Sequence, residues 1–339
     1  MCGWCVRIRR RRPGGSGSGP PAAGAHPIPG SLLATGAGKP VRIRLHRRKL
    51  AQGQDKMDWR LKVGRQAVLA RLPFGHGLRR AKRRLFGYQP NLDNLRSTIE
   101  AWTQMRQGLE RAGGAIEGAT VLEIGTGWFP TIPVLQCLQG AKRVYMSDLN
   151  VHLDEVSFTA TLDFLRQTWP DDARLRAIRT RADLPLTYLA PFDVNDLPDG
   201  SIDLVTSRTV LEHIPPTDLV QLFKALRPKL SARGRMVHLV DHSDHLEHSD
   251  KSITKINFLT WPERKHAWVN RLTREGENRL RHHEYPALFA EAGYRVTLEE
   301  HMVHEPTRQL ARSLPLQPHY AAMTPEQLAT MASLYVLEP

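Results

Sequence analysis

Ten residues decide how this chain folds: Val121-Leu122-Glu123-Ile124-Gly125-Thr126-Gly127-Trp128-Phe129-Pro130. An apolar run of strand type leads into two glycines, and a helical pattern follows them. A glycine lets the backbone turn tightly and lets a ligand approach where any Cβ would collide. The stretch therefore predicts a buried strand, a ligand-binding turn and a helix, in that order.

Outward from this turn, short apolar runs alternate with helical stretches, which is typical of a parallel sheet covered by helices on both faces. We expect six or seven strands, at residues 120–124, 143–146, 187–190, 202–207, 235–240, 294–298 and 334–337. We expect helices near residues 132–139, 152–168, 218–226 and 284–292. The predicted fold class is therefore α/β, with a doubly wound, mostly parallel sheet.

Three parts are predicted along the chain. Residues 1–56 are expected to form a disordered basic extension, because a stretch rich in Arg, Gly and Pro cannot bury enough apolar surface to offset the entropy of ordering it. A targeting peptide, a nucleic-acid-binding arm and a translation start at Met57 stay open for it. Residues 57–117 have helical periodicity and are expected to form an N-terminal helical cap. Residues 118–339 are expected to form the α/β domain, with an insertion at 246–283 that forms part of the substrate pocket.

The net charge of +14 suggests a nucleic-acid partner until the charges are located. Residues 1–54 contain 11 Lys or Arg and no acid, and residues 55–96 add 11 basic residues against three acids. Residues 97–339 therefore carry a net charge of −5, which argues against nucleic acid as the partner. The basic run at 79–84 is interpreted as a solvated face, with an acidic substrate or an anionic lipid as the alternatives.

Cysteine content and hydropathy indicate the compartment. Three cysteines are too few for a disulfide framework and fit a reducing environment, so we expect a cytoplasmic protein. No apolar run approaches the ~18–20 residues that a transmembrane helix needs. Peripheral contact with a membrane stays open, and the sequence gives no indication of the oligomeric state.

Glu123 indicates the charge of the ligand. It lies two residues before the first glycine, where a carboxylate would oppose the phosphates of a dinucleotide. A dinucleotide site also requires a third glycine for close helix packing, where this chain has Pro130. A cationic α-amino group and a sulfonium would instead favour that carboxylate, and the free amides of the turn at Thr126 and Gly127 suit a ligand carboxylate.

Further candidate cofactor residues follow three later strands. Asp148, with Leu149 after it, ends the second strand 23 residues after the first glycine, where a carboxylate accepts both ribose hydroxyls of an adenosine ligand. An ordinary helix cap is the alternative role for this acid. Asp193 can accept from an exocyclic adenine amine while the Val194 amide meets a ring nitrogen. Ser207, at the end of the fourth strand, completes the predicted set.

Two later motifs complete a resemblance to a known family. Residues 203–214 contain Asp-Leu-Val followed by Val-Leu-Glu-His-Ile, and residues 226–235 contain Leu-Arg-Pro-Lys-Leu and then Gly-Arg. With the glycine turn, residues 119–242 resemble class I, Rossmann-like S-adenosylmethionine-dependent methyltransferases of the small-molecule type. The resemblance implies S-adenosylmethionine as the cofactor and a seven-stranded sheet of order 3-2-1-4-5-7-6, here with N-terminal helices and an insertion between strands 5 and 6. Trp128-Phe129 replaces the family's third small residue, so we expect a bulkier loop over the methionine end of the cofactor.

Candidate catalytic residues lie at the carboxyl ends of the fourth and fifth predicted strands. His242 is the first choice for a general base, because it follows the fifth strand, where the acceptor should arrive. His213 and Glu212 are further candidates, and hydrogen bonding within the loops is the alternative role for all three. No metal is expected, because the series His242-x-x-His245-x-x-His248 on a helix would spread its imidazoles around an arc.

The leading hypothesis is methyl transfer to a small-molecule, sugar or lipid-type acceptor. An RNA methyltransferase that uses the basic N-terminal helices is a second hypothesis. Ser207-Arg208-Thr209 after the fourth strand argues against it, because neither an amine-gripping motif nor a cysteine nucleophile stands there. A third hypothesis is a non-catalytic scaffold that binds S-adenosylmethionine, which would show no methyl transfer.

Overall fold

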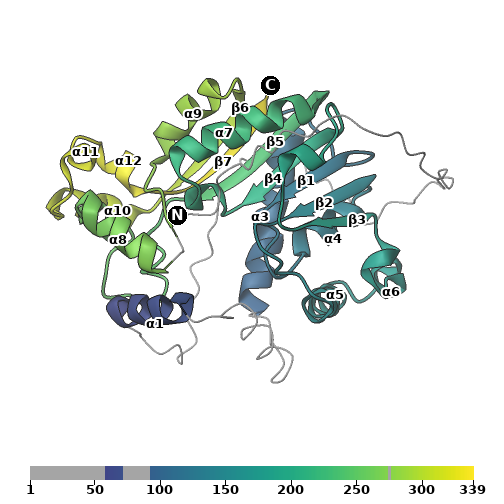
Figure 1. Cartoon of the computed structure of the whole chain (residues 1–339), viewed down its shortest axis with the longest axis horizontal. Helices are drawn as coiled ribbons and strands as arrows, with labels where there is room; N and C mark the ends of the chain where they lie inside the picture. Colours follow the sequence, from purple (N-terminus) through teal and green to yellow (C-terminus); the bar gives the residue numbers. More distant parts are fainter. Residues whose placement is uncertain (1–57, 72–91, 274–275) are drawn as a thin grey trace.

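The computed structural model describes residues 58–71, 92–273 and 276–339 (Figure 1). The extension predicted at 1–56 and the basic run at 79–84 lie outside the described residues. Those two predictions therefore stay predictions.

A seven-stranded sheet forms the centre of the described part of the chain. Its strands are β1 (Thr120–Ile124), β2 (Arg143–Ser147), β3 (Leu186–Leu189), β4 (Ile202–Arg208), β5 (Leu230–Asp241), β6 (Arg295–Val303) and β7 (Thr330–Glu338). They lie in the order β3-β2-β1-β4-β5-β7-β6. The first five pair in parallel, whereas β7 is antiparallel to both β5 and β6. The predicted fold class and strand order are confirmed.

The edge strand β6 is longer than its apolar pattern predicted. The prediction ended at residue 298, because Glu299, Glu300 and His301 are polar. These residues nevertheless pair with β7, with Glu299 opposite Tyr335 and His301 opposite Ser333. Backbone hydrogen bonds to the buried strand β7 therefore extend β6 beyond residue 298, where its apolar sequence pattern ends.

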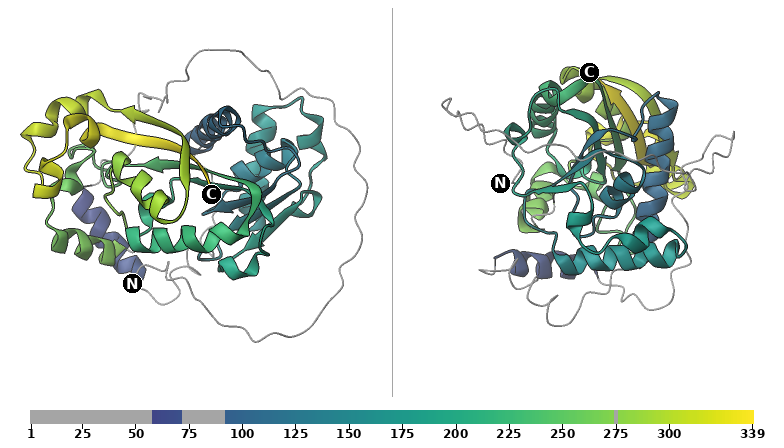
Figure 2. Two further views of the ribbon diagram at one scale, coloured as in Figure 1. Left: turned by 90° about the horizontal axis from the view of Figure 1, so that it is seen from above. Right: turned by 90° about the vertical axis from the view of Figure 1, so that its right-hand side faces the viewer.

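Helices cover both faces of the sheet (Figures 1 and 2). One face packs against α3 (Leu92–Arg111), α4 (Thr131–Leu138), α5 (Glu155–Thr168) and α6 (Ala173–Ala177). The other face packs against α7 (Pro216–Leu226) and α9 (Tyr285–Glu291). Val121 of β1 belongs to the first core and its neighbour Leu122 to the second. Burial on both faces explains why the central strands are almost continuously apolar in sequence.

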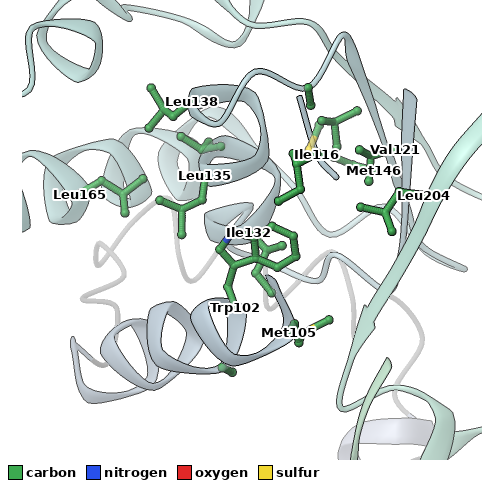
Figure 3. Close-up of a cluster of buried hydrophobic side chains, with 14 of the residues drawn as sticks. Trp102, Met105, Ile116, Val121, Ile132, Leu135, Leu138, Met146, Leu165 and Leu204 are labelled. Carbon is green, nitrogen blue, oxygen red and sulfur yellow. The ribbon is translucent and has the colours of Figure 1, made fainter. Parts of the chain in front are cut away.

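Figure 3 shows how α3 is held against the sheet. Trp102 and Met105 are buried in the first core with Ile132 of α4. The Trp102 indole also donates from Nε1 to Oε1 of Gln139 at 3.0 Å. This packing fixes the position of α3, whose first turns line the cavity described below.

The chain between β5 and β6 contains the predicted insertion. Its helix α8 (Glu263–Thr273) packs against α1 (Trp59–Arg71), and Val63 of α1 shares a third core with Phe258 and Trp261. The two helices of the predicted N-terminal cap thus pack on different parts, α1 on the insertion and α3 on the sheet. Between β6 and β7 lie α10 (Glu305–Leu310), α11 (Pro318–Ala321) and α12 (Pro325–Ala329). Within the described ranges, none of the helices combines the length and apolarity needed to cross a bilayer.

Candidate functional site

The turn between β1 and α4 requires glycine at two positions. Gly125 and Gly127 have φ angles of +74° and +72°, in the left-handed region that favours glycine. The N–H groups of Gly125 and Thr126 donate to the carbonyl oxygen of Ser147, at 2.8 and 3.2 Å, and that of Gly127 donates to Asp148, so the amides expected to be free are bonded within the protein. A Cβ on Gly125 would lie 2.6 Å from Cγ2 of Val210, whereas a Cβ on Gly127 would meet nothing within 4 Å. The turn is therefore packed at its first glycine and open at its second.

Glu123 lies at the start of this turn in a buried position, with 5% of its surface exposed. Its Oε2 accepts a hydrogen bond from Oγ1 of Thr126 at 2.6 Å. Burial raises the pKa of Glu123 to about 8, and the hydrogen bond from Thr126 opposes that rise. A ligand cation placed beside this carboxyl group would favour its ionised form.

Asp148 follows β2 and holds the other end of the turn. Its two carboxylate oxygens accept from the N–H of Gly127 at 3.2 and 3.1 Å. The hydroxyl of Tyr188 donates to Oδ2 at 3.1 Å. Burial raises the pKa of Asp148 to about 7, against the effect of these hydrogen bonds. The turn thus has a buried carboxyl group at each end, and Leu149 follows the second of them in a half-buried position.

Asp193 and Val194 lie on the connection from β3 to β4. Asp193 caps the short 3-10 helix η2 (Val194–Asp196), and its Oδ1 accepts from the backbone N–H of Asn195 at 2.9 Å. Val194 is buried in the core beneath α7 and α9. The cap fixes the Asp193 carboxylate in one orientation, although neither residue lines the cavity beside the turn.

A cavity of about 290 Å³ opens beside the glycine turn. It lies between the turn, the end of β4 and the first turns of α3. The residues that line it are Asn94, Leu95, Thr98, Glu123, Gly125, Thr126, Trp128, Phe129, Thr131, Ile132 and Arg208. The bulky pair at 128–129 therefore forms part of the cavity wall.

Arg208 ends β4, and its side chain reaches this cavity. Its Nε is buried and has no hydrogen-bond partner among the described residues. Burial lowers the pKa of Arg208, while the nearby carboxylates of Glu212, Asp241 and Glu123 raise it. The next residue, Thr209, has a φ of +51°, which strains a β-branched residue. A strained turn thus directly follows the guanidinium that lines the cavity.

One protein-family model matches residues 96–299, and it describes a methyltransferase domain. The chain belongs to this methyltransferase-domain family. Together with the order of the sheet, membership makes it an S-adenosylmethionine-dependent methyltransferase, as the sequence predicted. No sequence among the curated proteins matches the chain.

The methyltransferase is also similar to solved structures. An S-adenosylmethionine-dependent methyltransferase from Mesorhizobium loti has 18% identity over 70% of this chain and 97% of that chain, with a TM-score of 0.40. A geranyl diphosphate methyltransferase in complex with S-adenosylmethionine has 13% identity over 74% and 91% of the two chains, with a TM-score of 0.42. An S-adenosylmethionine-dependent methyltransferase from Leishmania major has 14% identity over 83% of each chain, with a TM-score of 0.39.

Two predicted site residues of the methyltransferase, His242 and Ser207, do not line the cavity. Nε2 of His242 lies 2.8 Å from Oγ of Ser333, and its Nδ1 lies 3.2 Å from the carbonyl oxygen of Leu280. Ser207 is fully buried, with its Oγ 2.7 Å from Nδ1 of His238 beneath α7 and α9. Both side chains thus have polar partners outside the cavity.

The other two predicted catalytic residues lie together in the 3-10 helix η3 (Leu211–His213). Glu212 is 4% exposed, and neither of its carboxylate oxygens has a hydrogen-bond partner among the described residues. Burial raises the pKa of Glu212 well above its ordinary value. His213 places Nδ1 2.8 Å from the carbonyl oxygen of Gly276, in the insertion.

Six residues that line the cavity were not predicted from the sequence: Asn94, Leu95, Thr98, Thr131, Ile132 and Arg208. The position of Arg208 at the carboxyl end of a buried parallel strand was a usable signal, because ligands bind at such strand ends. The residues of α3 carry no comparable signal. Their position depends on how Trp102 and Met105 pack against the sheet, which the local sequence does not specify.

Proposed function

We propose that this methyltransferase transfers a methyl group to a compact acceptor, such as a small molecule, a sugar or a lipid-type compound. The observation that carries the proposal is the pairing, in one cavity, of the buried carboxyl group of Glu123 with the half-buried guanidinium of Arg208. Two opposite charges match the α-amino and α-carboxylate groups of the cofactor's methionine portion. The open space beside Gly127 leaves room for a ligand against the backbone. The residues present therefore fit the cofactor.

The remaining cofactor contacts are proposed along the ends of β2 and β3. Asp148 would accept the ribose hydroxyls, because Gly127 and Tyr188 already orient its carboxylate. Leu149 would contribute an apolar contact next to it. Asp193 and the amide of Val194 would recognise the adenine, since the cap of η2 fixes both.

Orientation and exclusion of water are the proposed contributions of the chain to the reaction. Bound S-adenosylmethionine supplies a methyl group activated by its sulfonium. Trp128 and Phe129 form one wall of the cavity, and Leu95 on α3 lies on another. Apolar walls that exclude water and hold the acceptor in line favour a displacement reaction.

A general base is not required for every acceptor, and the cavity lining offers few candidates. Among the described residues that line it, Glu123 and Arg208 are the ionisable ones. Glu212 and His213 follow shortly after Arg208 and stay the proposed acid–base candidates on the acceptor side.

Charge favours the proposed acceptor class. The net charge of −5 on residues 97–339 does not favour a polyphosphate backbone. Because the three cysteines fit a reducing environment, we propose that the enzyme acts in the cytoplasm.

Two ligands test the proposed use of Arg208. S-adenosylhomocysteine carries the amino-acid portion, whereas 5′-methylthioadenosine lacks it. Arg208→Met should weaken S-adenosylhomocysteine by about 10- to 100-fold, the value of a charge-assisted hydrogen bond, and leave methylthioadenosine unchanged in isothermal titration calorimetry. Arg233→Met, at an exposed position, serves as the matched control. Equal effects of Arg208→Met on both ligands, or no effect on either, would contradict the proposal.

A further inference from the structure

Three potential metal ligands meet beyond the carboxyl ends of β4 and β5. Glu212 and His213 come from η3, and His245 follows β5 in the chain. Each offers one ligand atom, and these atoms all lie within 4.8 Å of one another. None of the three lines the cavity proposed for the cofactor.

Glu212 is the observation that points to a ligand. Its carboxylate is 4% exposed, and among the described residues neither oxygen has a hydrogen-bond partner. Burial first, and then the neighbouring carboxylate of Asp241, raise the pKa of Glu212. Carboxyl groups buried in proteins are as a rule hydrogen-bonded, paired with a cation or bound to a metal. Among the described residues the Glu212 carboxylate lacks the first of these and forms no ion pair within 4.0 Å, although the charge of Arg208 lowers its pKa from a greater distance.

Both imidazoles are oriented as metal-binding histidines are. Nδ1 of His213 lies 2.8 Å from the carbonyl oxygen of Gly276, and Nδ1 of His245 lies 3.1 Å from Oε1 of Glu277. That carboxylate oxygen also accepts from the backbone N–H of His245 at 3.0 Å. Because a carbonyl oxygen can only accept, the neutral His213 ring carries its proton on Nδ1 and its lone pair on Nε2. A metal-binding histidine usually donates its second ring N–H to a carbonyl or carboxylate oxygen, and this hydrogen bond fixes the orientation of the ring.

Asp241, at the end of β5, is placed to complete the set. Its Oδ1 accepts from the N–H and the hydroxyl of Ser243, at 2.8 and 2.7 Å. Its Oδ2 lies 3.7 Å from Nε2 of His245. Two ligand atoms of a tetrahedrally coordinated ion are about 3.4 Å apart when the metal–ligand bonds are about 2.1 Å. The observed separation is close to that distance. Two carboxylates would also match the double charge of such an ion.

We propose that Glu212, His213, Asp241 and His245 bind one divalent metal ion of the zinc class. Two imidazoles and two carboxylates suit zinc better than magnesium or calcium, which prefer oxygen ligands alone. The ion would tie the end of β4 to the end of β5, and the hydrogen bonds to Gly276 and Glu277 would tie it to the insertion. The proposal does not depend on the identity of the methyl acceptor. It is an alternative to the acid–base role proposed for Glu212 and His213, because side chains bound to an ion would not take up a proton from the acceptor.

A second group could compete for the ion. His282, Glu299 and His301 also lie within reach of a shared ion, but Glu299 and His301 are exposed. Nε2 of His282 lies 2.7 Å from Oε1 of Glu299, so this pair already forms an ion pair or hydrogen bond. His301 therefore provides the matched control for the test.

The experiment measures metal content and affinity in the tag-free full-length chain. We expect inductively coupled plasma mass spectrometry to find one zinc per chain after zinc loading and gel filtration. Glu212→Gln and His245→Ala should abolish stoichiometric zinc, and Glu277→Gln should weaken it by about 10- to 100-fold, as loss of a supporting hydrogen bond does. His301→Ala should retain the zinc of the wild-type chain. Circular dichroism establishes that each variant is folded, and Co²⁺ in place of Zn²⁺ should give the visible spectrum of a tetrahedral site.

Three outcomes would overturn the proposal. The first is a wild-type chain that retains no zinc after loading. The second is loss of zinc in His301→Ala, which would place the ion at the other group. The third is a folded Glu212→Gln variant that retains stoichiometric zinc with wild-type affinity.

Discussion

Glu123→Gln tests the buried carboxyl group at the start of the glycine turn. Glutamine keeps the size of the side chain and an oxygen that can accept from Thr126, but it cannot ionise. Burial raises the pKa of Glu123 from 4.5 to about 8 in the folded chain. The folded state therefore binds more protons than the unfolded state between these two values, and the stability that this provides is complete below pH 4.5. It is lost as the pH rises through about 8.

The size of the effect follows from the position of the pKa. A folded pKa of about 8 lies one unit above pH 7, so raising the pH from 7 to 9 should lower the free energy of unfolding by about 1.4 kcal/mol through Glu123 alone. Glu123→Gln should not show this loss. Asp148, with a pKa of about 7, titrates over the same range, and its charge raises the pKa of Glu123, so the difference between the two proteins reports Glu123 together with this coupling.

Urea unfolding, followed by circular dichroism at pH 7 and pH 9, measures the two free energies. Glu117→Gln is the control, because this carboxylate is exposed. The wild-type chain and Glu117→Gln should each lose about 1.4 kcal/mol more than Glu123→Gln between the two pH values. If Glu123→Gln loses as much as the wild-type chain, the burial assigned to this carboxyl group is wrong.

Two further substitutions test the turn itself. Gly125→Val should lose S-adenosylhomocysteine binding by more than about 10-fold in calorimetry, because its Cβ would collide with Val210 and its φ of +74° strains a β-branched residue. Gly118→Val shares the positive φ of +72° without a collision and should keep binding, so equal loss in both variants would count against this explanation. Asp148→Ala should weaken the same ligand by at least about 10-fold, because it removes a charged acceptor for the ribose hydroxyls. Unchanged affinity would refute the assignment.

The sheet and the glycine turn could be predicted from the sequence because their signals are local. The run from Val121 to Gly127 contains the buried strand, the two positive-φ positions and the carboxyl group in consecutive residues. The alternation of strands and helices then determines the layers, since burial on both faces produces continuous apolar runs. The order of the strands came from the resemblance to a family.

The side-chain arrangement of the site could not be predicted in the same way. Whether Ser207 or Arg208 faces the cavity depends on the phase of β4, and burial of the consecutive residues 204–207 does not distinguish the two faces of the strand. His242 was expected at the acceptor because it follows β5, but its ring nitrogens engage Leu280 and Ser333 instead. In the sequence, His245 belongs to a series of histidines and acids at 238–250, whereas the fold brings it to Glu212 and His213.

The position of β7 affects how the sheet is completed. β7 is synthesised after the other six strands, yet it lies between β5 and β6 and pairs with both. Until it emerges from the ribosome, β5 has an open edge and β6 has no neighbour, so the nascent chain exposes a template for intermolecular pairing. We therefore expect loss of residues 330–338 to cause aggregation during synthesis rather than a local defect, even though the cofactor turn lies two hundred residues earlier.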